Sequence, residues 1–142
     1  MKPYQHTQRG PRIVILMVVL AVVGAVVGSL FNPVLFVTVP ILLVTAWLFS
    51  SLTIAIADGE LRWHFGPGLI RKKVSVGEIA SAKVVRTNAL EGWGIHLSRF
   101  GWLYNIAGFN AVAITLKNGK HFALGTDEPD HLAEQILSAP KS

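Results

Sequence analysis

One uninterrupted stretch of 45 residues, from Ile13 to Ala57, contains no Asp, Glu, Lys, Arg or His. A soluble chain of 142 residues cannot bury the whole of so long an uncharged stretch, and a surface exposed to water needs charged and polar groups. The stretch therefore predicts a membrane segment. A helix needs about 20 apolar residues to cross the hydrocarbon core of a bilayer, so the stretch has enough residues for two such helices.

The dipeptide Asn32-Pro33 divides this stretch near its middle. Asn-Pro favours a turn, and a proline disfavours helical geometry in the residue before it. We therefore expect a hairpin of two transmembrane helices, 13–30 and 34–51. Gly24 and Gly28 form a G-x-x-x-G pair, whose small side chains allow close packing of another helix. The expected neighbour is the second helix of the hairpin, and a homo-oligomer is the alternative.

Basic residues flank the predicted hairpin. Residues 1–12 form a polar tail that carries Lys2, Arg9 and Arg12, and further basic residues follow the second helix. The positive-inside bias then predicts a multi-pass protein of the cytoplasmic membrane with both termini in the cytoplasm. A secretory signal peptide is the alternative, but its apolar core normally has about 7 to 15 residues. The first apolar segment here is longer, and a second one follows at once.

Residues 52–138 predict a small α+β domain, because the apolar pattern changes there from continuous to alternating. Asp58-Gly59 and Asn118-Gly119 are strong signals for two-residue hairpin turns. The expected strands cover 52–57, 61–65, 69–76, 79–87, 111–117 and 120–125. A C-terminal amphipathic helix follows, with acidic residues in its first turn where they favour the helix dipole. Residues 139–142 are expected to be a tail.

Several motifs between residues 92 and 129 are similar to those of one protein family. They are Gly92-Trp93-Gly94-Ile95, Gly101-Trp102-Leu103-Tyr104-Asn105, the segment from Ala111 to Lys120, and Gly125-Thr126-Asp127-Glu128-Pro129. With the order of strands and helix, the chain resembles the bacterial PH-like (pleckstrin-homology-like) membrane proteins, in which a two-helix hairpin precedes a PH-like domain. The resemblance implies a PH-like antiparallel β-barrel or sandwich of about seven strands with one C-terminal capping helix.

Charge and motif content disfavour several classes of function. The net charge is +5, but residues 58–142 hold ten basic and eight acidic residues, so the predicted domain is not basic enough to indicate nucleic acid binding. The chain has no cysteine, and its five histidines lack the spacing of a metal site. Catalytic and phosphate-binding motifs are also lacking. We therefore expect no enzyme activity, cofactor or metal.

Two groups of residues are candidates for binding. Residues 88–110 are rich in glycine and aromatic residues, and we expect Trp102, Phe100 and Phe109 to be exposed for a protein partner, whereas Trp93 and Tyr104 pack in the core. The second group is basic and lies on neighbouring strands, where Arg62, Arg71 and Lys73 take outward positions. It consists of Arg62, Arg71, Lys72 and Lys73, which are candidates for contact with anionic lipid headgroups.

The leading hypothesis is a membrane-anchored PH-like binding or scaffold module, without catalytic activity, that holds a protein partner or its own oligomer at the cytoplasmic face. An anionic-lipid recognition module and a small accessory subunit of a membrane transport complex are the alternatives. PH domains that bind phosphoinositides resemble one another in a basic first hairpin, whereas the first turn here is Asp58-Gly59. Any lipid contact is therefore expected to be diffuse attraction to membrane lipids.

Overall fold

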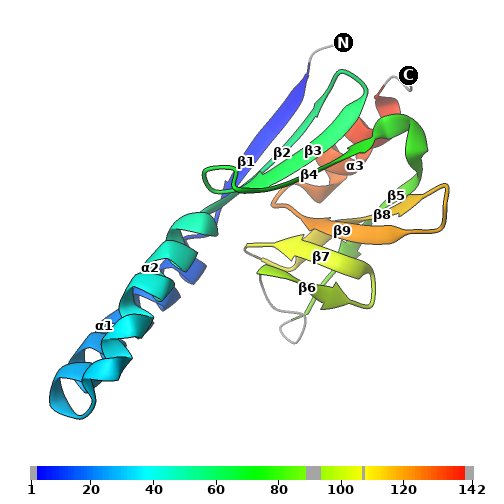
Figure 1. The fold of residues 1–142 in the computed structure, drawn as a ribbon. Helices are drawn as coiled ribbons and strands as arrows, with labels where there is room; N and C mark the ends of the chain where they lie inside the picture. The colour runs from blue at the N-terminus through cyan, green and yellow to red at the C-terminus, as the bar shows by residue number, and fades with distance from the viewer. Residues whose placement is uncertain (1–2, 89–93, 107, 140–142) are drawn as a thin grey trace.

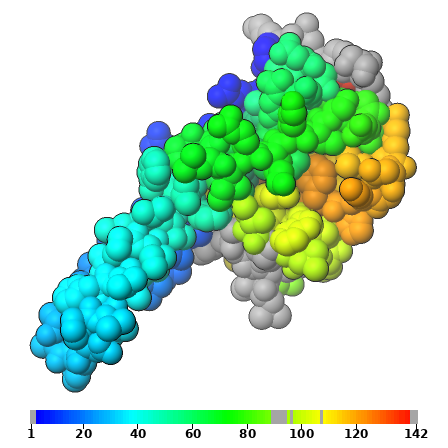
Figure 2. Space-filling model, in the orientation of Figure 1, coloured from blue at the N-terminus to red at the C-terminus, as the bar shows by residue number. Residues whose placement is uncertain are grey.

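A helical hairpin projects from a small α+β domain (Figure 1). The computed structural model describes residues 3–88, 94–106 and 108–139. Figure 2 shows the hairpin as an arm that extends well beyond the packed β domain. The molecule therefore has two parts with different surfaces, an apolar arm and a folded domain.

The arm consists of helix α1 (Pro11–Leu30), a 3-10 helix η1 (Pro33–Val37) and helix α2 (Thr38–Leu48). Asn32 begins η1, and its side-chain oxygen accepts a hydrogen bond of 3.0 Å from the amide of Val34. The turn predicted at Asn32-Pro33 is present. Most large apolar side chains of α1 and α2 are exposed, because these two helices contact each other and little else.

Within the described residues, α1 alone is long and apolar enough to cross a membrane. The expectation of two full spans is therefore not supported. The second apolar helical segment, Pro33–Leu48, is shorter than the predicted 34–51 because α2 ends at Leu48 and the chain enters a strand at Ser51. The fold thus contains one helix of spanning length and a shorter apolar helix packed against it.

The first sheet has four antiparallel strands in the order β1-β2-β3-β4. The strands are β1 (Tyr4–Arg9), β2 (Ser51–Ala57), β3 (Glu60–Phe65) and β4 (Ile70–Ser75). The alternating segments and the Asp58-Gly59 turn predicted the last three of these strands. The sequence predicted a polar tail at residues 1–12, whereas residues Tyr4–Arg9 form strand β1. Its residues pair with β2 from Tyr4 opposite Ile56 to Arg9 opposite Ser51.

The second sheet has five strands in the order β5-β8-β9-β7-β6. They are β5 (Ile79–Arg86), β6 (Gly94–Ser98), β7 (Gly101–Asn105), β8 (Asn110–Leu116) and β9 (His121–Gly125). A short 3-10 helix η2 (Val76–Glu78) links the two sheets. Strands β7 and β9 are parallel, whereas every other pair is antiparallel. The glycine-rich and aromatic stretch therefore supplies an antiparallel strand pair.

The expectation of an antiparallel β-barrel or sandwich is met only in part, because the described strands form two separate sheets, one of them with a parallel pair, and not a closed barrel. The expectation of a small α+β domain with a C-terminal helix is confirmed, since α3 (Pro129–Ser138) follows the last strand. Apolar residues from both sheets and α3 meet in one core. The largest fully buried members include Phe65, Leu61, Ile114, Leu124, Leu132 and Ile136. The two sheets and α3 therefore form an open sandwich.

The helical arm is inserted between two paired strands. Strand β1 leads directly into α1 and α2 returns into β2, and the amide of Gly10 donates a 2.9 Å hydrogen bond to the carbonyl of Ser50. The turn between β3 and β4 also lies against the arm, because a Cβ on Gly66 would be 2.7 Å from the carbonyl oxygens of Trp47 and Leu48. The arm is therefore held at its base by several backbone contacts.

Candidate functional site

A groove opens where β4 ends the first sheet and leaves part of the second sheet uncovered. We call it the distal groove, and it has a volume of about 910 Å³. Its lining comes from β3, β4, β6, β7, the end of β8, β9 and the turn between β8 and β9. The lining residues are Trp63, Lys72, Lys73, Val74, Leu97, Gly101, Trp102, Tyr104, Leu116, Asn118, Gly119, Lys120, His121 and Phe122. In Figure 2 the green β4 and the yellow β6 and β7 lie on the same face.

The floor of the distal groove is a cluster of aromatic rings. Trp63 stacks on Phe122 with the ring centroids 4.9 Å apart, and it meets Tyr104 edge to face at 5.4 Å. Burial raises the pKa of Tyr104 above its usual value, since an ionised phenolate would be poorly solvated there. Trp63 is 5% exposed, and its buried Nε1–H has no acceptor in the described part of the chain. The floor therefore combines apolar surface with one unsatisfied donor.

Two large apolar side chains at the side of the groove remain exposed. Leu97 is 71% exposed and Trp102 is 52% exposed. They are opposite each other in the register of β6 and β7, and Trp102 is also the register partner of Phe122. Because register partners share a face of a sheet, all three lie on the inner face that carries the core. Leu97 and Trp102 thus face the core side of the sheet, and no strand among the described residues covers them.

Positive charge surrounds the groove. Lys72 and Lys73 come from β4, and Lys120 lies in the turn before β9, whereas no Asp or Glu among the described residues lines the groove. Lys73 lies 3.8 Å from a carboxylate oxygen of Glu60. Lys72 and Lys120 form no ion pair within the described residues. The groove therefore suits an apolar ligand that also carries negative charge.

The groove lies on a flank of the domain, and the turns that border it point away from the helical arm. Figure 1 shows the turns from β6 to β7 and from β8 to β9 on the side away from α1 and α2. The opposite end of β7 is close to the arm, since a Cβ on Gly10 would lie 3.1 Å from the carbonyl oxygen of Ile106. This location gives the groove its name.

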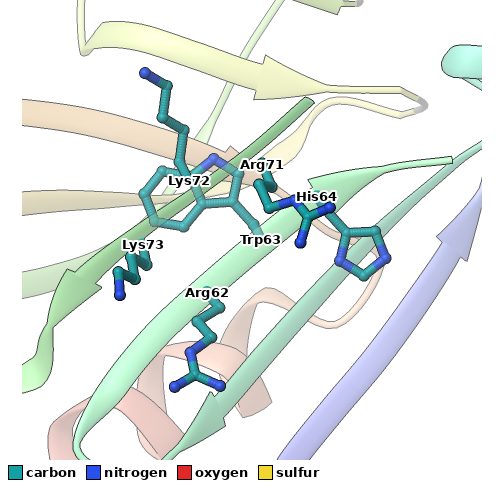
Figure 3. A pocket seen from close by; sticks show the side chains of 6 residues that line it. All are labelled: Arg62, Trp63, His64, Arg71, Lys72 and Lys73. Atoms are coloured by element: carbon teal, nitrogen blue, oxygen red, sulfur yellow. The ribbon is translucent and has the colours of Figure 1, made fainter. Parts of the chain in front are cut away.

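A second, smaller pocket of about 440 Å³ lies over β3 and β4, and we call it the basic pocket. It is lined by Arg62, Trp63, His64, Arg71, Lys72 and Lys73 (Figure 3). In the register of β3 and β4, Arg62 lies opposite Lys73, and His64 lies opposite Arg71. In Figure 3 the side chain of Lys72 extends away from those of Arg62 and Lys73. Of the basic group predicted from the sequence, Arg62, Arg71 and Lys73 thus share one face of the sheet, and Lys72 points to the other.

Glu60 neutralises part of this basic group. Its carboxylate accepts a 2.9 Å bond from Nε of Arg62 and lies near the ammonium group of Lys73. Arg62 and then Lys73 hold the pKa of the Glu60 carboxyl below its usual value. Arg71 is placed differently, because its Nε donates a 2.8 Å bond to the carbonyl of Gly68 in the turn that contacts the arm.

The predicted aromatic surface is only partly brought together. Trp102 lines the distal groove, whereas Phe109 is 36% exposed in the segment before β8 and does not line it. Phe100 is half-buried, packs against the small cluster of Leu103, Ala111 and Ala123, and lies under the guanidinium of Arg99 at 4.7 Å. Tyr104 is buried, as expected. Trp93 lies outside the described residues.

The two glycines of the G-x-x-x-G pair face the second helical segment of the same chain. A Cβ on Gly24 would lie 2.7 Å from the hydroxyl oxygen of Thr38, and one on Gly28 would lie 3.4 Å from the ring of Phe36. Gly28 is buried in this contact. The close helix approach that the motif predicted occurs within the hairpin.

The sequence analysis did not select Trp63, Leu97 or Lys120 for the site. Trp63 carries the ordinary signal of a core position, because it alternates with Leu61 and Phe65 along β3. Lys120 follows a hairpin turn, where a lysine is unremarkable. No cluster of three or more metal-ligating side chains occurs in the part of the chain that the structure describes.

Two comparisons with known proteins give no match to this chain. No model of a known protein family matches it, and a search of curated proteins gives no significant match. The PH-like resemblance therefore stays a prediction. Function has to be inferred from the two parts of the structure, the apolar arm and the domain with its two basic surfaces.

Proposed function

We propose that this chain is a membrane-anchored binding module. Its hairpin enters the bilayer, and its β domain holds a protein partner at the cytoplasmic face. The observation that carries the proposal is the way in which the helical arm is connected to the β domain. An exposed apolar hairpin is inserted between the paired strands β1 and β2, in a domain that presents a groove on its flank.

The dimensions of the hairpin support insertion into a bilayer. The 20 residues of α1 rise about 30 Å at 1.5 Å each, which matches a hydrocarbon core of about 30 Å. In the returning segment the five residues of η1 rise about 2 Å each, so η1 and α2 together reach about 26 Å. The returning helix is thus short by only a few ångströms, which a bilayer accommodates by local thinning.

The residues at the base of the hairpin support this placement. Trp47 is exposed near the end of α2, and Arg9 and Arg12 are exposed at the start of α1. Indole rings and basic side chains both favour the headgroup layer. The basic residues also favour a cytoplasmic location of the domain.

The proposal is tested in cells with the full chain. We expect the chain to stay in the membrane fraction after alkaline carbonate washing, with reporters fused to both termini active in the cytoplasm. A photo-cross-linking residue at Trp102 is expected to form a discrete adduct with one protein, and the same residue at exposed Lys83 on β5 is the control. A soluble chain, a periplasmic domain, or the absence of adducts at both positions overturns the proposal.

Lipid recognition is the second candidate, and one observation favours it. Arg71 lies next to the turn from β3 to β4 that contacts the end of α2, so its charge sits near the level at which the hairpin enters the bilayer. We expect micelles doped with phosphatidylglycerol to raise the melting temperature more than micelles with phosphatidylcholine, and high salt to remove the difference. Arg71→Glu removes it too, whereas Lys83→Glu retains it. Equal melting temperatures in both lipids exclude this candidate.

A further inference from the structure

We propose that the distal groove binds an extended acidic segment of a partner protein, which adds to the free edge of β4 as a further strand. The inference rests on the proposed function, because it names how the module holds its partner. It depends on the free edge, the uncovered apolar face, the unpaired lysines and the location of the groove.

The edge of β4 provides backbone partners. β4 is the last strand of the first sheet, and no strand in the described part of the chain pairs with its outer side. An edge strand presents a row of unpaired N–H and C=O groups, and an incoming extended segment can satisfy them. Residues 72 to 74 of this strand line the distal groove directly.

The uncovered apolar face provides the second part of the site. Strands in a sheet lie about 4.8 Å apart, so a segment paired with β4 extends the first sheet by one strand. The extension lies over the part of the second sheet where Leu97 and Trp102 are exposed. Every second side chain of the segment then points down onto these two residues and the aromatic floor.

Charge selects an acidic segment rather than any extended one. Lys72 flanks the groove from β4 and Lys120 flanks it from the turn before β9. Within the part of the chain that the structure describes, neither lysine has an ion pair and no carboxylate lines the groove. Charge complementarity of this kind favours the partner with the opposite charge and repels basic ones.

One buried donor adds a polar contact at the floor. The Nε1–H of Trp63 has no acceptor in the described part of the chain, and a buried unpaired donor is costly. In Figure 3 the indole nitrogen lies on the same side as the stem of Lys72. A carbonyl or carboxylate oxygen of a bound segment next to β4 is the expected acceptor.

Location favours a protein segment over the bilayer. The five residues of β7 span about 16 Å between the base of the arm near Ile106 and the far end at Gly101. The headgroup region of a bilayer adds only about 6 Å on each side of the hydrocarbon core. The far end of β7, beside Trp102, thus lies farther from the base of the arm than the headgroup region is thick, which favours a partner from the cytoplasm.

The test uses the full chain in nanodiscs of phosphatidylcholine and a fluorescein-labelled peptide of five Glu-Val repeats, with binding followed by anisotropy. The acidic peptide is expected to bind, and the matched Lys-Val peptide and a fully N-methylated acidic peptide are not. The amide I band of carbon-13-labelled bound peptide is expected in the strand region. Lys72→Glu, Leu97→Ser and Trp102→Ala each weaken binding by about tenfold or more, and Lys83→Glu leaves it unchanged.

Three results overturn the inference. They are equal binding of the basic or N-methylated peptide, equal effects of Lys72→Glu and Lys83→Glu, and binding that appears only when the nanodiscs contain anionic lipid. Leu97 is a surface side chain, so Leu97→Ser keeps the test informative if Trp102→Ala fails to fold. If the peptide does not bind but a cross-linking residue at Trp102 still forms an adduct with one protein in cells, strand addition is wrong and the proposed function stands. Loss of membrane placement removes the proposed function itself.

Discussion

Replacing Gly101 with alanine tests how β7 and β9 form the floor of the distal groove. Gly101 has a φ of +86°, and a Cβ at this position would lie 2.2 Å from the carbonyl oxygen of His121. Gly119 offers a matched control, because its φ is +91° but no atom lies within 4 Å of the position of its Cβ. Both variants force alanine into a left-handed conformation, and only Gly101→Ala also forces two strands apart.

The magnitude follows from these contacts. The left-handed conformation costs a non-glycine residue roughly 1–2 kcal/mol, so the free energy of unfolding falls by this amount in both variants. Real Cβ contacts below 3.0 Å are essentially not seen, so β9 must move by about 0.8 Å in Gly101→Ala. This movement takes the nearest hydrogen bonds between the parallel strands beyond their normal length. Two lost bonds at about 1 kcal/mol each make Gly101→Ala less stable than Gly119→Ala by about 2 kcal/mol.

Equilibrium unfolding of the full chain in mild detergent measures this difference. Near-UV circular dichroism reports the packing of the Trp63 and Phe122 rings. Phe122 lies opposite Trp102 at the start of the parallel β7–β9 pair, so the signal is sensitive to this strand contact. We also expect Gly101→Ala to weaken binding of the acidic peptide, because the floor and the exposed indole move together. Free energies of unfolding that agree within about 0.5 kcal/mol for the two variants would refute the strand contact as the reason for glycine at position 101.

Three further predictions concern the hairpin, the tyrosines and the core. Gly24→Leu is expected to separate the two helices and lower the melting temperature in detergent, whereas Gly28→Ala, with more room, changes it little. Burial, first of all, raises the pKa values of Tyr4 and Tyr104 above their usual 10.0, so the unfolded chain loses these protons first. The free energy of unfolding is therefore fully retained below about pH 10 and falls at higher pH, and each Tyr→Phe variant reduces the fall in urea titrations at about pH 9 and 11. Phe65→Ala, at a fully buried position, is expected to cost about 3–5 kcal/mol in the same unfolding assay, and a loss below about 1 kcal/mol would contradict its place in the core.

The sequence predicted those parts of the fold that depend on neighbouring residues. Leu61, Trp63 and Phe65 alternate with polar residues and form one buried face of β3. Asp58 and Gly59 both have positive φ, the backbone geometry that the hairpin turn needs. These features are local, because the alternation of side chains along a strand and the residue types of a turn both depend on a few neighbouring residues.

Strand β1 depends instead on distant residues. Its sequence is almost entirely polar, and it pairs with residues 51–56, which follow the whole hairpin. Tyr4 donates a hydrogen bond to Glu128, and His6 lies 2.5 Å from Asp127, so the start of the α3 segment also holds this strand. Neither contact leaves a periodic apolar signal in residues 4–9, which therefore resemble a tail.

The distal groove arises from the number of strands in the two sheets, a quantity that no short motif encodes. The sequence analysis expects Trp102 to be exposed because it lies in a presumed loop, whereas it is exposed on the inner face of a strand that the first sheet does not cover. The difference changes what a test of the site has to perturb. If Trp102 were in an exposed loop, peptide binding would depend on Trp102 alone. On an uncovered sheet face, binding also depends on β4, which supplies the free edge and Lys72. A β4 substitution that weakens peptide binding as much as Trp102→Ala, with the fold intact, is therefore the result that separates the two accounts.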